Sequence, residues 1–124
     1  MACLDSYIPN RVRLAKYKVE LQPDASYEWS VAVVPNADNR SKDVIAKGVI
    51  KRISAPGDLA NRLAQMGDLE RAAAYGQAGI WYDAFESVSN AIEAHPDDAA
   101  LHAQRASLLQ QVGLSQAAAF DKKK

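Results

Sequence analysis

Few side chains in this sequence are suited to catalysis or metal binding, and those few are widely spaced. The only histidines are His95 and His102, which lie seven positions apart with Pro96 between them. A metal site needs several ligands that converge on one point. We interpret His95 as a residue at a helix end and His102 as a packed or exposed residue, and we expect no metal site.

Asp83 and Glu86 come nearest to a carboxylate pair for acid and base chemistry. Both lie in the first turn of the helix expected after Gly79, where negative charge is favoured by the positive end of the helix. Asp97 and Asp98 mark the start of the next helix in the same way. The sequence contains no glycine-rich phosphate loop, CxxC pair or serine elbow. We therefore expect no enzyme, no catalytic residue and no cofactor.

The tripeptide Asn39-Arg40-Ser41 has the form of a glycosylation acceptor, but it follows Asp38 and other turn-forming residues. We interpret it as turn chemistry, with Arg40 as the residue there that is able to bind an anion. Cys3 is the single cysteine. One cysteine excludes an internal disulfide and a cysteine-based zinc site within one chain.

The composition is that of an ordinary soluble globular protein, with 48% hydrophobic and 24% charged residues among 124. The 15 basic residues balance 15 acidic ones, so no overall field attracts nucleic acid or an anionic membrane. The N-terminus lacks the apolar run of a secretory signal, and no stretch is long enough to span a membrane. We expect no nucleic-acid binding, no membrane insertion and, as written, a cytoplasmic protein.

The elements that would position these residues divide the chain into a β segment, residues 1–55, and an α-helical segment, residues 56–124. Hydrophobic side chains alternate with polar ones in three runs, so we predict three antiparallel strands with bulges at Ala15 and Gly48. The residues predicted to face inward in the first two runs are Val12, Leu14, Tyr17, Val19, Leu21, Tyr27, Trp29, Val31 and Val33.

The second segment is rich in alanine and is interrupted by glycine and proline. We predict helices over residues 58–66, 69–78, 81–94 and 98–112 and a short helix from 115, followed by a disordered basic tail. Strands followed by helices predict an α+β fold, in which a partial β-sandwich precedes an antiparallel helical segment.

The spacing Leu21-x-Pro23-x-x-x-Tyr27 resembles the tyrosine corner of fibronectin type III and immunoglobulin-like sandwiches, where the tyrosine hydroxyl makes a hydrogen bond back to the backbone. Such sandwiches have about seven strands, so this chain would hold half of one. Burying the inward set would contribute roughly 15–30 kcal/mol. We therefore expect the face to be covered by a second copy in a homodimer, with the helix at 58–66 as the alternative.

The helical segment resembles a tetratricopeptide repeat. Its marker positions are Gly79, Ala84 and Pro96, and Gly113 repeats Gly79 after 34 residues, as Ala106 and Ala118 repeat Ala72 and Ala84. The pattern departs from the repeat at His102 and Arg105, which stand where tryptophan and leucine are usual. The resemblance implies a protein or peptide partner on the helices.

Trp81, Tyr82 and Phe85 form the densest aromatic cluster of the chain. Trp81 and Phe85 occupy positions that the repeat buries, so we expect them in the core. Tyr82 is expected on the more exposed side and is the candidate contact residue.

Taken together, residues 27–53, 72–92 and 108–114 resemble a bacterial family known as domain of unknown function 928, with residues 27–30, 39–41 and 78–84 as the most specific parts. The resemblance covers roughly residues 11–114. Members of that family are usually longer and often exported, and the family has no established activity.

The sequence therefore predicts a non-enzymatic interaction or assembly module that self-associates through its sheet face. The predicted interface residues are Val12, Leu14, Trp29, Val31, Val33 and Tyr82. Two alternatives stay open at this point: a truncated remnant of a longer cell-envelope protein, and a small-ligand binder or enzyme with an unrecognised site.

Overall fold

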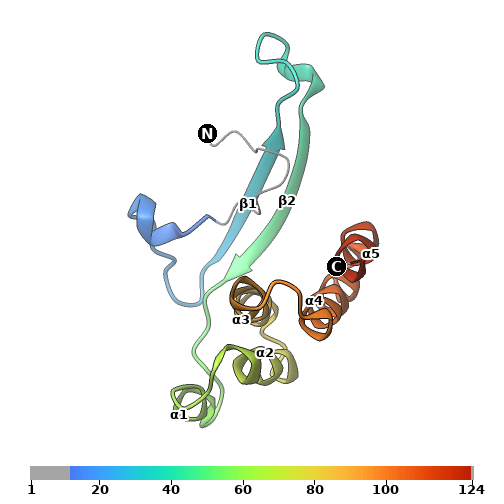
Figure 1. Ribbon diagram of the computed structural model, residues 1–124. Coiled ribbons are helices and arrows are strands. Elements are labelled where there is room, and N and C mark those ends of the chain that lie inside the picture. Colours follow the sequence, from blue (N-terminus) through green and yellow to red (C-terminus); the bar gives the residue numbers. More distant parts are fainter. Residues whose placement is uncertain (1–11, 124) are drawn as a thin grey trace. The chain divides into compact units, whose positions relative to one another are not determined.

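A computed structural model describes residues 12–123 and divides the chain into two units, Met1–Ser54 and Ala55–Lys124. The described part of the first unit contains a two-stranded antiparallel sheet, and the second unit contains five α-helices (Figure 1). The predicted α+β class is confirmed. The predicted absence of an intrachain disulfide concerns Cys3, which lies outside the described residues.

The sheet is formed by β1 (Ser26–Val33) and β2 (Val44–Lys51), which run as one long twisted ribbon (Figure 1). Their register is continuous from Ser26 opposite Lys51 to Val33 opposite Val44. The bulge predicted at Gly48 is therefore wrong. Gly48 lies opposite Trp29, and a Cβ atom added to it would stand 2.3 Å from the indole ring, so the ring occupies the space of a side chain.

The strand predicted over residues 12–21 is wrong, because the chain there forms a 3-10 helix, η1 (Leu14–Tyr17). Lys18 ends η1 with a φ of 56°, a left-handed conformation outside the extended region of a regular strand. The amides of Lys18 and Val19 donate back to the carbonyls of Ala15 and Leu14, which uses groups that a ladder would need. The sheet of the described residues therefore has two strands, and the three-stranded half-sandwich is not formed.

A ten-residue loop, residues 34–43, joins the two strands and contains a second 3-10 helix, η2 (Arg40–Lys42). The Asn39 side chain caps η2 by accepting a hydrogen bond from the Ser41 amide at 3.3 Å. Asn36 makes a similar turn by accepting from the Asp38 amide at 3.0 Å. The Asn39 side chain therefore stabilises a turn, as predicted.

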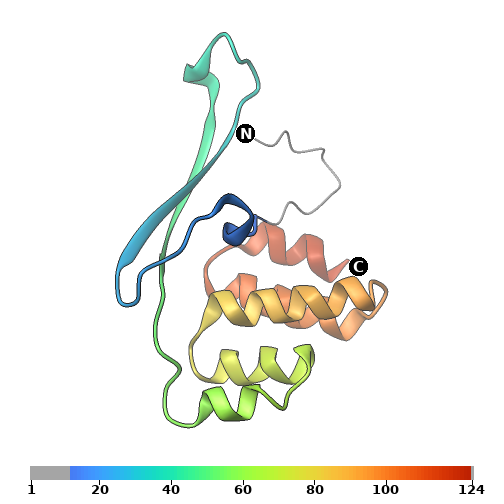
Figure 2. The ribbon, with the colours of Figure 1, turned by 90° about the vertical axis from the view of Figure 1, so that its left-hand side faces the viewer.

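The helices are α1 (Leu59–Leu63), α2 (Asp68–Gln77), α3 (Trp81–Ala94), α4 (Ala99–Gln111) and α5 (Ser115–Lys122). From α2 onward each helix packs on the next, and the short connections make neighbours antiparallel (Figure 2). Gly79 and Gly113 end their helices with φ of 75° and 80°, conformations that glycine adopts without strain. The boundaries agree with prediction to within a few residues, although α1 is shorter than expected. The predicted basic tail is helical at Lys122.

The core of the helical unit consists of two apolar clusters. The larger one joins α2, α3 and α4 and contains Ala72, Ala84, Val88, Ala91, Ile92, Leu101 and Leu108. The smaller one joins α4 and α5 and contains Ala106, Leu109 and Ala118. Ala72, Ala84, Ala106 and Ala118 are at most 2% exposed, so these small side chains lie where the helices approach most closely.

Candidate functional site

The two faces of the β1–β2 ribbon differ sharply in character. Residues directly opposite each other share a face, and successive residues alternate between faces. One face, here called the apolar face, contains Tyr27, Trp29, Val31 and Val33 of β1 opposite Ile50, Gly48, Ala46 and Val44 of β2. None of these eight residues is charged. The charged residues Glu28, Lys47 and Lys51 are all on the other face, where Lys47 lies 3.9 Å from Glu28.

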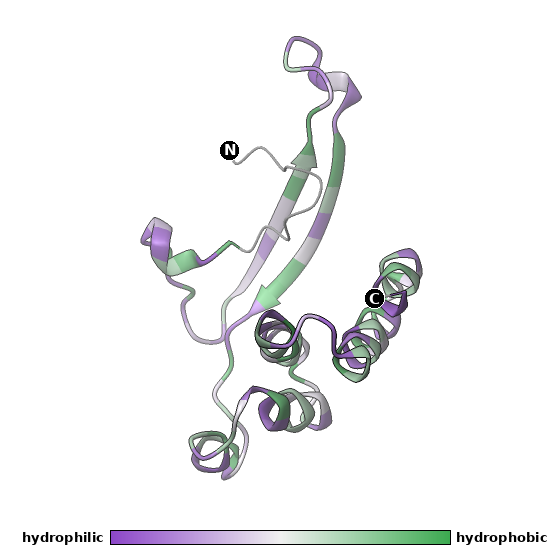
Figure 3. Cartoon of the chain, viewed as in Figure 1, coloured by the Kyte–Doolittle hydropathy of each residue, from purple (hydrophilic) through white to green (hydrophobic). Residues whose placement is uncertain are grey.

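Much of the apolar face is exposed. Val31 and Val33 are 56% and 55% exposed, and Val44 on the neighbouring strand is 67% exposed. The hydropathy colouring shows the same end of the ribbon as apolar on both strands (Figure 3). Of the predicted interface residues, Trp29, Val31 and Val33 lie on this face, whereas Val12 and Leu14 lie beside or within η1 and share no strand with them.

The base of the ribbon is fixed by the corner residues. The Tyr27 hydroxyl accepts a hydrogen bond from the backbone amide of Gln22 at 2.9 Å, the type of backward bond expected at a tyrosine corner. Arg52 donates to the Leu21 carbonyl at 3.1 Å, and Pro23 forms an isolated bridge with Arg52. Leu21, Pro23 and Tyr27 therefore come together at one end of the ribbon.

Asp83 and His95, two of the residues considered for catalysis, lie at opposite ends of α3. Asp83 and His95 lie twelve residues apart, in the first turn and at the C-cap of α3, so about 18 Å of helix separates them. Burial, and after it the charge of Glu86, raises the pKa of Asp83. Arg40 in the strand connection donates to Asp43 at 2.7 Å and thus has an internal partner.

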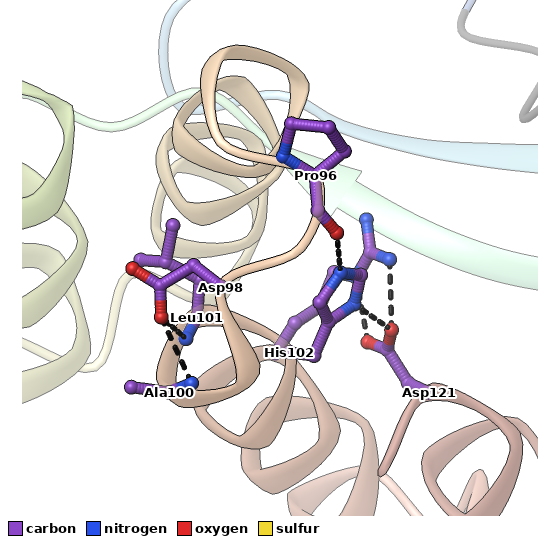
Figure 4. Close-up of polar contacts among 7 residues, drawn as sticks. Pro96, Asp98, Ala100, Leu101, His102 and Asp121 are labelled. Carbon is purple, nitrogen blue, oxygen red and sulfur yellow. Dashed lines mark hydrogen bonds and ion pairs between the residues drawn. The ribbon is translucent and has the colours of Figure 1, made fainter. Parts of the chain in front are cut away.

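The most organised polar site of the helical unit is one that the sequence analysis did not find. His102 and Arg105 of α4 meet Asp121 of α5, and we call these three residues the buried ion cluster (Figure 4). Arg105 donates twice to Asp121, at 2.6 and 2.8 Å, and His102 Nδ1 lies 2.8 Å from the same carboxylate. The second His102 nitrogen, Nε2, lies 2.7 Å from the Pro96 carbonyl oxygen.

Two members of the cluster are buried, and the third member, Arg105, is partly buried. His102 and Asp121 are each 4% exposed. Burial raises the pKa of Asp121, but hydrogen bonds and charge from Arg105 and His102 outweigh it, so the pKa is lowered overall. The Asp121 carboxylate oxygen and the Pro96 carbonyl oxygen that face His102 can only accept hydrogen bonds. The ring therefore donates to both of them only when both of its nitrogens carry protons.

The sequence does contain a clue to this cluster. His102 and Arg105 stand where the repeat pattern has large apolar residues, and a charge at a buried position requires a buried partner. A search for an acidic residue on the next helix would have identified Asp121. His102, which was predicted to be either packed or exposed, is packed.

The aromatic cluster links α3 to α4. The indole N–H of Trp81 donates to the Leu108 carbonyl at 2.8 Å, and the indole stacks on Phe85 with ring centroids 5.0 Å apart. Trp81 and Phe85 are partly buried and contact both apolar clusters. Tyr82 lies edge-on to Trp81 and is 38% exposed.

Pro96 and Asp98 organise the start of α4. Pro96 lies in the connection from α3, and Asp98 is the N-cap, accepting from the amides of Ala100 and Leu101 at 2.9 and 3.3 Å (Figure 4). This agrees with the interpretation of Asp98 as a helix start. The Pro96 carbonyl in turn contacts His102, so the connection is held to α4 at both ends.

Residues 12–123 contain neither a metal-binding cluster nor a membrane-spanning helix. No group of three or more histidine, cysteine, aspartate or glutamate side chains is arranged to hold a metal ion in this range. No helix in the same range has the length and apolar character needed to cross a membrane.

Comparison with protein families matches residues 10–121 to the family described as Domain of Unknown Function (DUF928). Comparisons with curated proteins and with solved structures gave no match.

Proposed function

The chain belongs to the DUF928 family, and we propose that it is a non-enzymatic interaction and assembly module that self-associates through the apolar face of its ribbon. The observation that carries this proposal is the separation of charge between the two faces. All charged side chains of β1 and β2 lie opposite the apolar face, so that face can be buried without desolvating a charge.

A second copy is the partner that fits this face best. A two-fold axis brings the same surface of both copies together, so an uncharged face meets an uncharged face. Depletion of charge with retention of aromatic residues is typical of the centre of protein interfaces, and Trp29 and Tyr27 supply the aromatic residues here.

The expected affinity is modest. Val31, Val33 and Val44 are between 55% and 67% exposed. Burying the exposed parts of these three valines on both copies would contribute about 5–9 kcal/mol to association. Association costs at least ~4 kcal/mol in lost translation and rotation. The difference of about 1–5 kcal/mol corresponds to a dissociation constant near millimolar at best from the valines alone. Trp29 adds to the contact, so we expect dimers at about millimolar concentration.

The helices supply a second interaction surface in this proposal. Residues 34 positions apart have matching environments: Ala72 and Ala106 are buried alike, and so are Ala84 and Ala118. This supports a tetratricopeptide-like arrangement that presents helices to a peptide. The bond from Gln22 to Tyr27 likewise supports an immunoglobulin-like origin for the β segment.

The absence of enzyme activity is part of the proposal. Asp83 and His95 are separated by most of α3, and the buried ion cluster is closed by its own hydrogen bonds. A group that is to move protons for a substrate must lie within hydrogen-bond reach of it.

Solution mass as a function of concentration tests self-association. Sedimentation equilibrium of the wild-type chain should rise from 13.5 kDa toward twice that mass. Val31→Asp, on the apolar face, should stay at the monomer mass. The matched control is Ile45→Asp, because Ile45 is 57% exposed like Val31 but lies on the other face.

The control should dimerise like the wild type. A wild-type chain that stays monomeric at millimolar concentration, or two variants that lose dimerisation equally, would contradict the proposed face. Far-UV circular dichroism of both variants confirms that they keep their secondary structure.

A further inference from the structure

The His102 ring contacts two parts of the helical unit that are far apart in the sequence. Its Nδ1 atom lies 2.8 Å from a carboxylate oxygen of Asp121, nineteen residues later in α5. Its Nε2 atom lies 2.7 Å from the carbonyl oxygen of Pro96, six residues earlier in the α3–α4 connection. The residue is only 4% exposed, so little water competes for either contact. One imidazole therefore links the α3–α4 connection to the last helix (Figure 4).

The charged groups in contact within this cluster come from α4 and α5. Asp121 of α5 faces the ring, and Arg105 of α4 donates to the same carboxylate. Lys122, the neighbour of Asp121, is exposed. The buried residues of α3 are all uncharged. The α3–α4 connection contributes three exposed titratable residues, His95, Asp97 and Asp98.

Within the cluster, only the ring can change its proton content near neutral pH. Arg105 stays cationic at every pH of interest. Burial raises the pKa of Asp121, but hydrogen bonds and charge from Arg105 and His102 outweigh it, so the carboxylate stays ionised well into the acid range. Histidine is the side chain that ordinarily changes charge between pH 5 and 8. A change of proton content in that range therefore falls on the ring.

The number of protons on the ring decides which contacts it makes. Both facing oxygens only accept, so two hydrogen bonds need two N–H groups. Hydrogen bonds to an ionised acceptor are roughly twice as strong as neutral ones, so a single ring proton stays on Nδ1, which faces Asp121. Nε2 and the Pro96 oxygen then present lone pairs to each other, and their contact at 2.7 Å becomes repulsive.

We propose that His102 is a pH-sensitive latch between the α3–α4 connection and α5. With two ring protons, it holds both. When Nε2 gives its proton to water, the ring keeps Asp121 and releases the Pro96 carbonyl. The closed form binds one proton more than the open form, so acidification closes the latch and a rise in pH opens it. The latch lies within the helical unit, and it does not depend on self-association through the ribbon.

Opening of the latch is a local event. The Asp98 amide still donates to the His95 carbonyl at 3.1 Å, and the Asp98 side chain still caps α4. Both helices therefore stay folded while the turn between them loses one of its attachments. Loss of a hydrogen bond from a charged donor should lower the protection of the Asp98 amide from hydrogen exchange by about tenfold.

NMR titration of the isotope-labelled wild-type chain tests the latch directly. The two His102 ring nitrogens report how many protons the ring carries, and the Pro96 carbonyl carbon reports whether that carbonyl accepts a hydrogen bond. We expect two ring protons at about pH 5, a single one on Nδ1 above about pH 8, and a Pro96 signal that shifts over the same interval. A proton count that stays constant across this range, or a Pro96 signal that does not follow it, would overturn the proposal.

Hydrogen exchange at the Asp98 amide provides the second measurement. After correction for the intrinsic exchange rate, protection in the wild type should fall about tenfold between about pH 5 and pH 8. His102→Gln has a side chain of fixed proton content, so its protection should not depend on pH. His95→Gln is the matched control, because His95 is the other histidine, is exposed and adjoins Pro96.

The control should keep the pH dependence of the wild type. A control that loses it, or a His102 variant that keeps it, counts against the latch. The NMR titration needs no substitution, so it decides the question even where His102→Gln impairs folding. Neither measurement reads the mass of the chain, so these outcomes are separate from those that test the apolar face.

Discussion

Replacing Asp121 by asparagine removes the negative charge of the buried ion cluster while preserving the shape of the side chain. The Arg105 and His102 groups that donate to Asp121 at 2.6–2.8 Å would then face a neutral amide. One of them would have to approach an N–H group, which cannot accept a hydrogen bond. The variant therefore leaves the Arg105 guanidinium and the His102 ring without a charged acceptor.

The loss of stability follows from the burial of the three side chains. His102 and Asp121 side chains are each 6% exposed, so little water reaches the carboxylate. Breaking a buried ion pair by removing one partner typically costs about 3–5 kcal/mol. The Arg105 side chain is 21% exposed and can recover some hydration, so we expect the lower end, about 3 kcal/mol. For a unit of this size the melting temperature should fall by roughly 10–20 °C.

Urea unfolding followed by far-UV circular dichroism measures this loss. Asp97→Asn is the matched control, because it removes the same charge from an exposed position in the α3–α4 connection. The control should change stability by less than about 0.5 kcal/mol. If Asp121→Asn also stays within that limit, the cluster does not hold α5 in place.

The difference in stability between the wild type and Asp121→Asn should change with pH in a definite direction. The pKa of Asp121 is lowered in the folded chain, so the carboxylate stabilises the fold above its unfolded pKa of about 3.9. This stabilisation is lost as the pH falls through the lower pKa that Asp121 has in the folded chain. The gap between wild type and Asp121→Asn should be full near neutral pH and shrink below about pH 4. A gap that grows on acidification would refute the assignment.

Three further substitutions test the local structure. Gly48→Val should destabilise the ribbon by about 2 kcal/mol, because the Trp29 ring occupies the space of the new side chain, and near-UV circular dichroism should report the displaced indole. Gly76→Ala should stabilise the helical unit by about 0.5–1 kcal/mol in thermal unfolding, because an added Cβ meets no atom within 4 Å. Tyr27→Phe should cost about 0.5–1 kcal/mol through loss of the Gln22 hydrogen bond, measured by urea unfolding.

Each of these expectations has a result that contradicts it. An unchanged indole spectrum in the Gly48 variant would mean that the ring does not cover the glycine. A destabilised Gly76 variant would indicate a contact at that position. A Tyr27 variant of wild-type stability would show that the corner bond contributes nothing.

The helices were predictable because their ends are chemically marked. Gly79 and Gly113 adopt the positive φ that ends a helix, and Asp98 caps the next one with its side chain. These are local effects that act through the backbone of a few residues. α3 accordingly spans the predicted residues 81–94.

The β segment was less predictable because alternation alone does not make a strand. β1 and β2 alternate and also pair with each other, so their pattern and their hydrogen bonds agree. Residues 12–21 alternate as well, but the left-handed Lys18 interrupts the extended backbone. A strand needs a partner for its backbone groups, and periodicity does not supply that information.

Charge placement decides what kind of partner each unit is able to take. On the ribbon, Glu28 and Lys47 lie away from the apolar face, so that face can pair with many apolar surfaces and gains little selectivity. On α4, His102 is buried and the Arg105 side chain is 21% exposed, and a packed helix without a carboxylate would leave both without the acceptor that Asp121 provides. The penalty for a mismatched helix, more than the strength of the matched contact, makes this surface of α4 selective.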